Sequence, residues 1–373
     1  MPRTSGRRGE PAARPFDNRA MQWDLYCRVV DNFGDIGVAW RLAADLAGRG
    51  ESVRLAVDDA SALTWLAPHG APRVDVVAWD AGTSAAPDVV VELFGGGRPR
   101  AAWPADTRAP VLVNVEHLTA ERYAERSHAL PSPTARPGEP ATTTWFYFPG
   151  FSSQSGGLLR EPGLLEQRRA FGDGSVWLAT LGVAVRPGER CVVLFGYRND
   201  AIDELVDVLA ASPTLLLAAP GPGLEQVAAC LGPSLSRGAL RAVAMPWLSQ
   251  ANFDRLLWSS DLNLVRGEDS FVRAIWAGAP FVWQLYVQDD DAHRAKLAAF
   301  LDRYLAGAGE ALGTAVRSAF ARWNGAPTAS LAALAGDSAV RAAWSAHALA
   351  WRDTLASQSD LATRLLAFVE GKR

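Results

Sequence analysis

Short apolar strands alternate with amphipathic helices in two successive series, and this pattern restricts the fold more than any other feature of the sequence. The first series begins with WDLYCRVV just after Met21, continues with the helix VAWRLAADLAGRG and reaches APVLVNVEH. The second runs from GERCVVLFGY to APFVWQLY, and the chain is almost entirely helical from Asp290 onward. Continuous Val, Leu and Ile runs between helices are typical of parallel strands covered on both faces. The sequence therefore predicts two Rossmann-like α/β domains with a cleft between them and a helical C-terminus.

Composition shifts divide the chain. Residues 1–21 are rich in Arg, Pro and Gly and lack an apolar core, so they are expected to be a disordered tail or the product of an upstream start codon, and no secretory signal. The two series join near LGVAVRPGE, which predicts an N-terminal domain over 22–184 and a C-terminal domain over 185–354. Residues 355–373 are expected to pack back on the first domain. The proline-rich residues 127–143 are expected to form a surface loop.

Charge and cysteine usage exclude several classes of protein. The 373 residues carry a net charge of −3, which argues against a protein that mainly coats nucleic acid. Apolar stretches fall short of the roughly 20 residues that cross a membrane. Cys27, Cys191 and Cys230 lie far apart without a metal-ligand spacing, so a reducing, cytoplasmic compartment is expected. Lys296 and Lys372 are the only lysines, which we attribute to codon bias.

The loop after the first strand, VVDNFGDIG, is acidic. Ligands of open α/β sheets bind at the carboxyl ends of strands. This loop lacks the G-x-G-x-x-G pattern of a dinucleotide site, and Asp31 and Asp35 would repel a phosphate. Paired carboxylates at a cleft suit general-base catalysis and a cationic acceptor. The alternative, which the spacing leaves equally open, is that Asp35 only caps the following helix.

The loop after DLNLVR has the features of an anion site. It brings Arg266, Glu268, Asp269 and Ser270 to a helix start, where free N–H groups and the helix dipole attract anions. The two acids disfavour a bare phosphate but suit sugar hydroxyls. Together these residue types are what a nucleotide-sugar requires. The alternative is that they are ordinary first-turn residues.

Aromatic residues stand at neighbouring strand ends. Phe195 and Tyr197 in LFGY are expected on one side of their strand, and Phe253 follows the turn MPWLSQAN. Such side chains can enclose a nucleobase, although core packing is the more frequent role for any one of them.

Metal binding is not expected. YVQDDDAH contains three consecutive acids, but consecutive side chains diverge, and the start of a helix explains them better than a metal site does. His117 and His128 flank a loop and are expected to be surface residues.

Five motifs occur in one order over residues 23–300: CRVVDNFGDIGVAWRLA, VNVEHLTAE, TWFYFPGF with SGGLLRE, VVLFGY, and RGEDSFVRAIWAGAPFVWQLYVQDDDAH. Together they resemble the EarP family of protein-arginine rhamnosyltransferases, which modify bacterial translation elongation factor P. The resemblance implies a GT-B glycosyltransferase architecture, dTDP-β-L-rhamnose as donor without a further cofactor, and one arginine of elongation factor P as acceptor. It also implies inversion of the anomeric carbon and, through the modified factor, relief of ribosome stalling.

The resemblance also implies roles for single residues. Asp35 matches the general base and Asp31 its partner, with Glu268 as a third catalytic carboxylate. The matching thymidine pocket consists of Phe195, Tyr197, Gln250 and Phe253, the residues that hold diphosphate and sugar are Arg266, Glu268, Asp269 and Ser270, and the acceptor side of the cleft holds Asn32, Phe33 and Gly34. The alternatives are a GT-B nucleotide-sugar epimerase without a protein acceptor, a nicotinamide oxidoreductase and a non-catalytic binding module.

Overall fold

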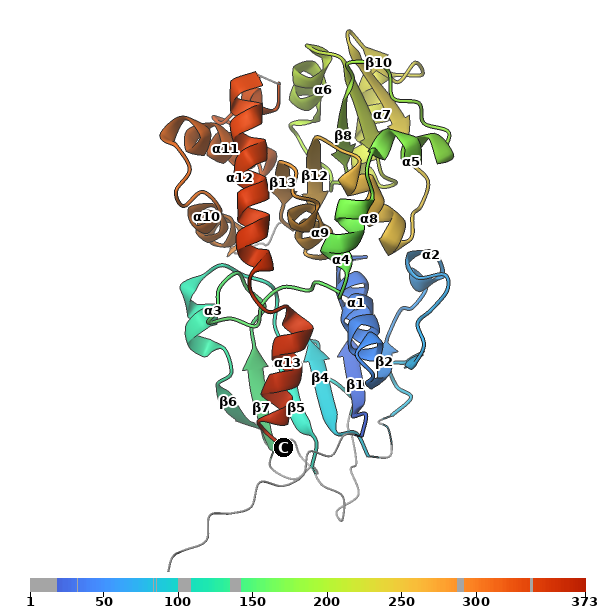
Figure 1. Cartoon of the computed structure of the whole chain (residues 1–373), viewed down its shortest axis with the longest axis vertical. Helices are drawn as coiled ribbons and strands as arrows, with labels where there is room; N and C mark the ends of the chain where they lie inside the picture. Colours follow the sequence, from blue (N-terminus) through green and yellow to red (C-terminus); the bar gives the residue numbers. More distant parts are fainter. Residues whose placement is uncertain are drawn as a thin grey trace, which may run out of the picture.

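Each βα series builds its own sheet. The structure, a computed structural model, describes residues 19–31, 33–82, 84, 86–99, 109–134, 142–286, 292–335 and 338–373. Figure 1 shows the two halves stacked, with the strands of the first sheet pointing toward the second half. Most of the N-terminal tail, Asn32 and residues 287–291, which include the three consecutive acids, lie outside the described residues.

The first sheet is almost entirely parallel. Within the described residues its seven strands follow the order β3-β2-β1-β4-β5-β7-β6, and only the β6–β7 pair is antiparallel. The strands are β1 (Gln22–Cys27), β2 (Ser52–Val57), β3 (Val74–Ala78), β4 (Val89–Leu93), β5 (Val111–Val115), β6 (Pro131–Thr134) and β7 (Thr142–Tyr147). The helices of this half are α1 (Gly34–Gly48), α2 (Leu63–Leu66) and α3 (Arg122–Ser127).

Strand β6 corrects the prediction of a surface loop over 127–143. Pro131 lies opposite Trp145, and Pro133 lies opposite Thr143. Proline has no N–H to donate to a ladder, so it is restricted to edge strands, and β6 is the last strand of its sheet. The loop prediction is wrong for β6, because a proline-rich composition also fits an edge strand, and at its two ends, where Ser127 belongs to α3 and Thr142 and Thr143 to β7; residues 135–141 lie outside the described residues.

The second sheet repeats the parallel arrangement. Within the described residues its six strands follow the order β10-β11-β9-β8-β12-β13, and only β10–β11 is antiparallel. The strands are β8 (Arg190–Leu194), β9 (Thr214–Ala218), β10 (Ser236–Arg237), β11 (Leu240–Ala244), β12 (Leu262–Arg266) and β13 (Phe281–Gln284). The helices from the link onward are α4 (Leu164–Ala170), α5 (Gly174–Thr180), α6 (Ile202–Ala210), α7 (Pro222–Leu231), α8 (Gln250–Trp258), α9 (Asp269–Ala277), α10 (Ala292–Tyr304), α11 (Glu310–Trp323), the 3₁₀ turn η1 (Ala332–Leu334), α12 (Ser338–Ala356) and α13 (Leu361–Glu370).

Two facing Rossmann-like halves with a helical C-terminus form the GT-B architecture, which confirms the predicted fold class. We find no helix within the described residues with the length and apolar character that a bilayer crossing requires.

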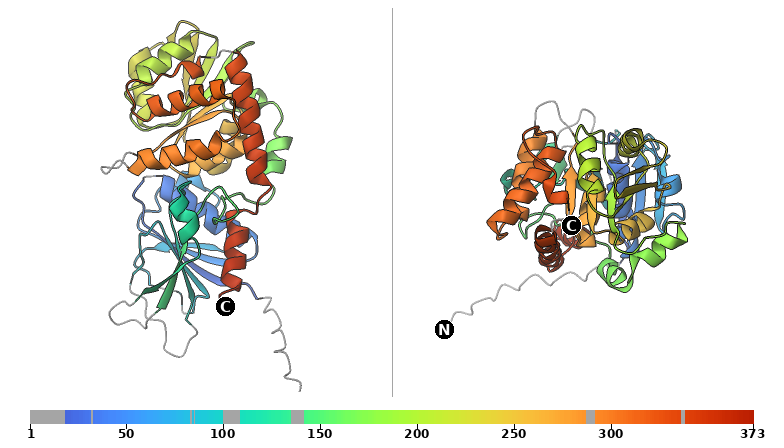
Figure 2. Two further views of the ribbon diagram at one scale, coloured as in Figure 1. Left: turned by 90° about the vertical axis from the view of Figure 1, so that its left-hand side faces the viewer. Right: turned by 90° about the horizontal axis from the view of Figure 1, so that it is seen from above.

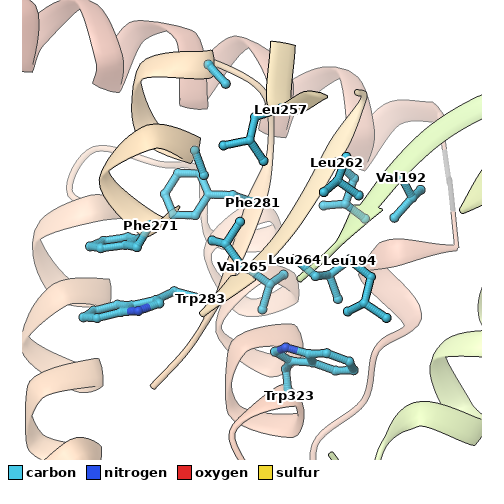
Figure 3. Packing of buried hydrophobic residues seen from close by; sticks show 14 of the residues in the cluster. Val192, Leu194, Leu257, Leu262, Leu264, Val265, Phe271, Phe281, Trp283 and Trp323 are labelled. Carbon is cyan, nitrogen blue, oxygen red and sulfur yellow. The ribbon is translucent and has the colours of Figure 1, made fainter. Parts of the chain in front are cut away.

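Aromatic packing anchors the loop between β12 and α9. Phe271, the residue after Ser270, stacks on Trp283 of β13 with ring centroids 3.9 Å apart, and both are buried. Val265 of β12 lies in the same cluster (Figure 3). The loop from Arg266 to Ser270 therefore begins and ends in the rigid core of the second half.

The chain crosses between the two halves twice. It first passes from β7 to α4, and it returns from α12 to α13, which lies on the first sheet in both side views (Figures 1 and 2). Leu365 and Val369 of α13 are buried in the core of the first half. The two crossings touch, because the Leu361 N–H donates to the Leu158 carbonyl at 2.9 Å.

Five charged side chains join the halves at the interface, and we call them the interdomain ion cluster. Arg41 of α1 contacts Asp269 at 2.7 Å, Asp254 at 3.2 Å and Glu161 at 3.2 Å. Arg273 of α9 contacts the same Asp254 at 2.7 Å and the same Glu161 at 2.5 Å. Arg41 is buried, and in such a site each charge depends on its partners because water cannot replace them.

We expect Arg41→Met to lower the free energy of unfolding by about 3–5 kcal/mol, because it leaves the buried Asp254 and the partly buried Glu161 and Asp269 facing one arginine. The matched control is Arg169→Met, which removes an exposed ion pair with Glu166 and should change stability by less than about 0.5 kcal/mol. Urea denaturation of both variants measures the difference. Equal losses in the two variants would show that the cluster does not hold the halves together.

Candidate active site

The candidate site lies in the cleft between the halves and consists of two cavities. The aromatic cavity is lined by rings from both halves, with Phe33, Trp65, Phe195, Trp247 and Phe253 among them. The carboxylate cavity is lined by the acids and bases Arg28, Asp35, His117, Glu268, His293 and Lys296, together with apolar residues. Asp31, Gly34 and Gly267 line both. The two cavities therefore meet at the Asp31 carboxylate.

Asp31 is bound across the interface. The Tyr197 hydroxyl, from the loop after β8, donates a hydrogen bond of 2.6 Å to its Oδ2. Burial raises the pKa of Asp31, although this hydrogen bond and the charge of Arg266 act in the opposite direction. Tyr197 was expected to line the thymidine pocket, but the structure places its hydroxyl on a carboxylate of the other half.

Two glycines make room for the Asp31 carboxylate. A Cβ atom added to Gly34 would lie 2.7 Å from Oδ2, and one added to Gly267 would lie 3.0 Å from the same atom. Gly267 also has a φ of +63°, which disfavours other residues. A side chain at either position therefore displaces Asp31.

Asp35 holds the loop that carries Asp31. It is buried in the first turn of α1, and its Oδ2 accepts the backbone N–H groups of Val30 and Asp31, each at 2.9 Å. The N-cap of α1 is Phe33, and no side chain caps that helix. The alternative that Asp35 is only a helix cap is therefore wrong.

Arg266 lies between two aromatic rings. Its guanidinium carbon is 4.5 Å from the ring centroids of both Phe195 and Tyr197, which follow the end of β8 at Leu194. Burial lowers the pKa of Arg266, against the opposing charge of Asp31. The Ser270 hydroxyl bonds to the backbone N–H and carbonyl of Arg266 and so closes the loop. Phe253 meets Phe195 edge to face at 5.5 Å and completes the ring set.

Glu268 and Asp269 are adjacent in sequence but have different partners. Glu268 accepts a hydrogen bond from the Leu118 N–H at 3.0 Å, and it contacts Lys296 at 2.9 Å and His117 at 3.2 Å. Burial disfavours its charge, yet Lys296 and His117 outweigh this and lower the pKa of Glu268 to about 2. Asp269 belongs to the interdomain ion cluster.

Gln250 also bridges the halves, because its amide donates to the Gly37 carbonyl at 2.9 Å. Gln250 and Asp269 both line the aromatic cavity. The wall of this cavity thus depends on contacts with the first half.

The sequence did not reveal several residues of the cleft. Trp247 is 47% exposed, and its ring lies 4.5 Å from that of Trp65 and 5.2 Å from that of Phe33, so these side chains join the halves at the aromatic cavity. Tryptophan at a helix or loop position usually indicates core packing, and no local sequence pattern separates a tryptophan of the core from one that lines a cleft.

Both histidines expected at the surface have specific partners. His117 is exposed but faces the carboxylate cavity and stacks on Phe94. Its pKa is raised because Glu268 outweighs the effect of burial. His128 is half-buried, accepts the Phe148 N–H at 3.1 Å, and has its pKa lowered to about 4 by burial. The surface expectation is wrong for His128.

Among the described residues, no group of three or more His, Cys, Asp or Glu side chains is arranged to hold a metal ion. The run of acids at 289–291 lies outside that description.

Comparisons with known proteins agree on one family. A sequence model of the elongation factor P (EF-P) rhamnosyltransferase EarP matches residues 23–370. A protein-arginine rhamnosyltransferase of Pseudomonas aeruginosa is 42% identical over 374 residues, which cover 93% of this chain and 98% of that protein. One of Pseudomonas putida is 40% identical over 386 residues with the same coverage.

A solved structure gives the same result. It describes the structural basis for EarP-mediated arginine glycosylation of translation elongation factor EF-P, and it aligns with a TM-score of 0.67 and 31% identity over 95% of this chain and 100% of that chain.

We expect Gly34→Ala to abolish most rhamnosyl transfer without loss of stability. Alanine in the first turn of α1 favours the helix by about 0.5–1 kcal/mol, whereas the new methyl group must displace the Asp31 carboxylate. A misplacement of about 1 Å in an active site costs about 100-fold in rate. Initial rates and thermal unfolding measure the two effects.

The control for that change is Gly313→Ala in α11, where an added Cβ meets no described atom within 4 Å. It should leave the rate unchanged. A Gly34→Ala enzyme with the wild-type rate would show that the position of Asp31 does not matter.

Proposed function

This chain belongs to the EarP family and is a protein-arginine rhamnosyltransferase, and from that premise we propose that it transfers rhamnose from dTDP-β-L-rhamnose to an arginine of translation elongation factor P. The anomeric carbon is inverted, no metal or further cofactor takes part, and the reaction occurs in the cytoplasm. The modified factor then relieves ribosome stalling.

The observation that carries this proposal is the meeting of the two cavities at Asp31. The aromatic cavity suits thymidine, because Phe195 and Phe253 offer apolar ring surfaces to a base. The diphosphate lies at Arg266 and the start of α9, where positive charge and free N–H groups favour an anion. The rhamnose then extends toward Asp31, where the cavities join.

The carboxylate cavity suits the acceptor guanidinium. Asp31, Asp35 and Glu268 present carboxylates there, and carboxylates bind a guanidinium with paired, charge-assisted hydrogen bonds. The low pKa of Glu268 keeps it negatively charged, so we assign it to binding the guanidinium rather than to taking its proton.

Proton transfer must accompany bond formation. A guanidinium has a pKa above about 12 and no free lone pair, so a carboxylate cannot deprotonate it in advance. We assign to Asp35 the polarisation of the guanidinium and the acceptance of its proton as the C–N bond forms. Its Oδ2 already accepts two backbone N–H groups, so Oδ1 is the atom assigned to this step. The sugar–phosphate bond breaks at the same time, and Arg266 stabilises the departing diphosphate.

One experiment tests the proposal. The enzyme is incubated with dTDP-β-L-rhamnose, with and without elongation factor P, while dTDP release and the mass of the factor are followed. The proposal predicts dTDP release only with the factor, which gains one deoxyhexose on an arginine. A donor altered without any acceptor would indicate an epimerase, and an unchanged donor would indicate a binding module.

We expect Asp35→Asn to remove catalysis while donor affinity stays close to wild type. Asparagine still offers an oxygen to the N–H groups of Val30 and Asp31, so the loop remains in place. Loss of a general base costs about 10²–10⁴-fold in rate. Turnover and calorimetric dTDP affinity are the measurements, and a wild-type rate would contradict the assignment.

Phe253→Ala should weaken dTDP binding by roughly tenfold, and Phe253→Tyr should largely preserve it, because a stacked ring is worth about 0.5–1.5 kcal/mol beyond its buried area. Calorimetry with thermal unfolding of both variants tests this. Unchanged affinity with a strongly lowered melting temperature would assign Phe253 to the core.

A further inference from the structure

Lysine is rare in this chain, and one lysine lies in the carboxylate cavity. Of the 37 basic side chains only Lys296 and Lys372 are lysines. Codon bias explains the excess of arginine but does not explain why a lysine stands at position 296. Lys296 of α10 is largely buried, and its Nζ lies 2.9 Å from Glu268 Oε1.

Lys296 is one of three groups that hold Glu268. Oε1 of Glu268 also faces His117 Nδ1 at 3.2 Å, and Oε2 accepts the Leu118 N–H at 3.0 Å. His117 and Leu118 belong to the first half, whereas Lys296 approaches from α10 of the second. Each oxygen of Glu268 therefore has a fixed partner, and Lys296 supplies the partner with a permanent charge.

The chemistry of the cavity explains the choice of an ammonium. An arginine at position 296 would offer its own planar guanidinium to Glu268, the same group that the acceptor presents. Lysine supplies its positive charge as a compact ammonium group. It lacks the planar, forked N–H groups with which a guanidinium pairs with two carboxylate oxygens.

We propose that Lys296 is a positioning residue that holds the Glu268 carboxylate, charged and oriented, for the acceptor guanidinium. This rests on the assignment of the carboxylate cavity to the acceptor under the proposed function. Lys296 itself does not touch the reacting atoms.

The charged groups around Glu268 determine the pH dependence. Asp31 faces the same cavity from the loop after β1 and Asp35 from the first turn of α1; His117 follows β5, His293 and Lys296 come from α10, and Arg28 follows β1. Loss of Lys296 removes the larger of the two charges that lower the pKa of Glu268 and leaves the titratable His117. The pKa of Glu268, about 2 in the native protein, then rises. A carboxylate loses its charge as the pH falls below its pKa, so in the variant Glu268 becomes protonated at a higher pH, which a titration of its own carboxyl group measures.

The test compares Lys296→Met with Lys372→Met, which carries the same substitution at the other lysine. Lys372 lies over the Trp145 ring, far from the cleft in sequence and structure. We expect Lys296→Met to lower kcat/KM for elongation factor P by about 10–100-fold, the worth of a hydrogen bond to a charged group, with the donor KM unchanged. The pKa of its Glu268 carboxyl rises, whereas Lys372→Met behaves as wild type. Lys296→Arg restores the charge and lowers the pKa of Glu268 again.

A second measurement does not depend on turnover. The carboxyl carbon of Glu268, labelled with ¹³C and assigned through Glu268→Gln, is titrated by NMR in wild type and Lys296→Met without substrates. If the wild type failed to modify elongation factor P, the proposed function would fail, and this titration would still decide the role of Lys296. An unchanged Glu268 titration in Lys296→Met overturns the proposal.

Chemical modification covers the case in which Lys296→Met does not fold. In Lys372→Arg, Lys296 is the only lysine, so amine-directed acetylation of the folded enzyme modifies Lys296 and the α-amino group alone and removes the charge of Lys296 without a mutation at that position. Acetylation that occupies Lys296 and leaves kcat/KM intact contradicts the proposal, and a fall equal to that expected for Lys296→Met supports it.

Discussion

The buried contact of Arg41 with Asp254 and Asp269 holds the two halves in the arrangement on which both cavities depend. Neither cavity exists within one half: the aromatic cavity needs Phe33 and Trp65 of the first half, and the carboxylate cavity needs Glu268 of the second. A buried charge that loses its partner costs several kcal/mol of stability. This contact therefore favours the alignment of the two halves in which Arg41 meets its carboxylates over alignments that separate them. The hydrogen bonds from Tyr197 to Asp31 and from Gln250 to Gly37 then complete the same alignment at the site itself.

Within that arrangement the protein separates the proton affinities of neighbouring carboxylates. Burial raises the pKa of Asp31, whereas Lys296 and His117 overcome burial and lower that of Glu268. Groups whose environments shift their pKa values apart take different roles in acid–base chemistry. Lys296 and His117 therefore favour the charged form of Glu268, whereas burial disfavours the charged form of Asp31 against the hydrogen bond from the Tyr197 hydroxyl.

The sequence predicted the parts of this site that depend on local order and missed those that depend on the contact between the halves. Alternating strands and helices place Asp31 after β1 and Arg266 after β12, so the loops at the carboxyl ends follow from periodicity alone. The different partners of Glu268 and Asp269 do not, because they arise from Arg41 and His117, which are more than a hundred residues away. Strand β6 was missed for another reason: its prolines favour a loop in any local reading, and only pairing with β7 makes them an edge. The spacing alone allows Asp35 to be a helix cap or an anchor of the preceding loop. Only its hydrogen bonds from the N–H groups of Val30 and Asp31 decide between these two roles.

The paired crossings of the chain restrict how substrates can enter. The segment before α4 and the segment before α13 lie against each other, joined by the Leu361 N–H on the Leu158 carbonyl, and Arg160 adds bonds to the carbonyls of Ala356 and Gln358. Two covalent connections side by side act as a hinge between the halves. The halves can rotate about this hinge, but they cannot slide or twist freely. The interface therefore opens widest at the edge farthest from the hinge. Separation of the halves must break the contacts of Arg41, while the contacts along the hinge persist. Closure then returns the Tyr197 hydroxyl to the Asp31 carboxylate each time.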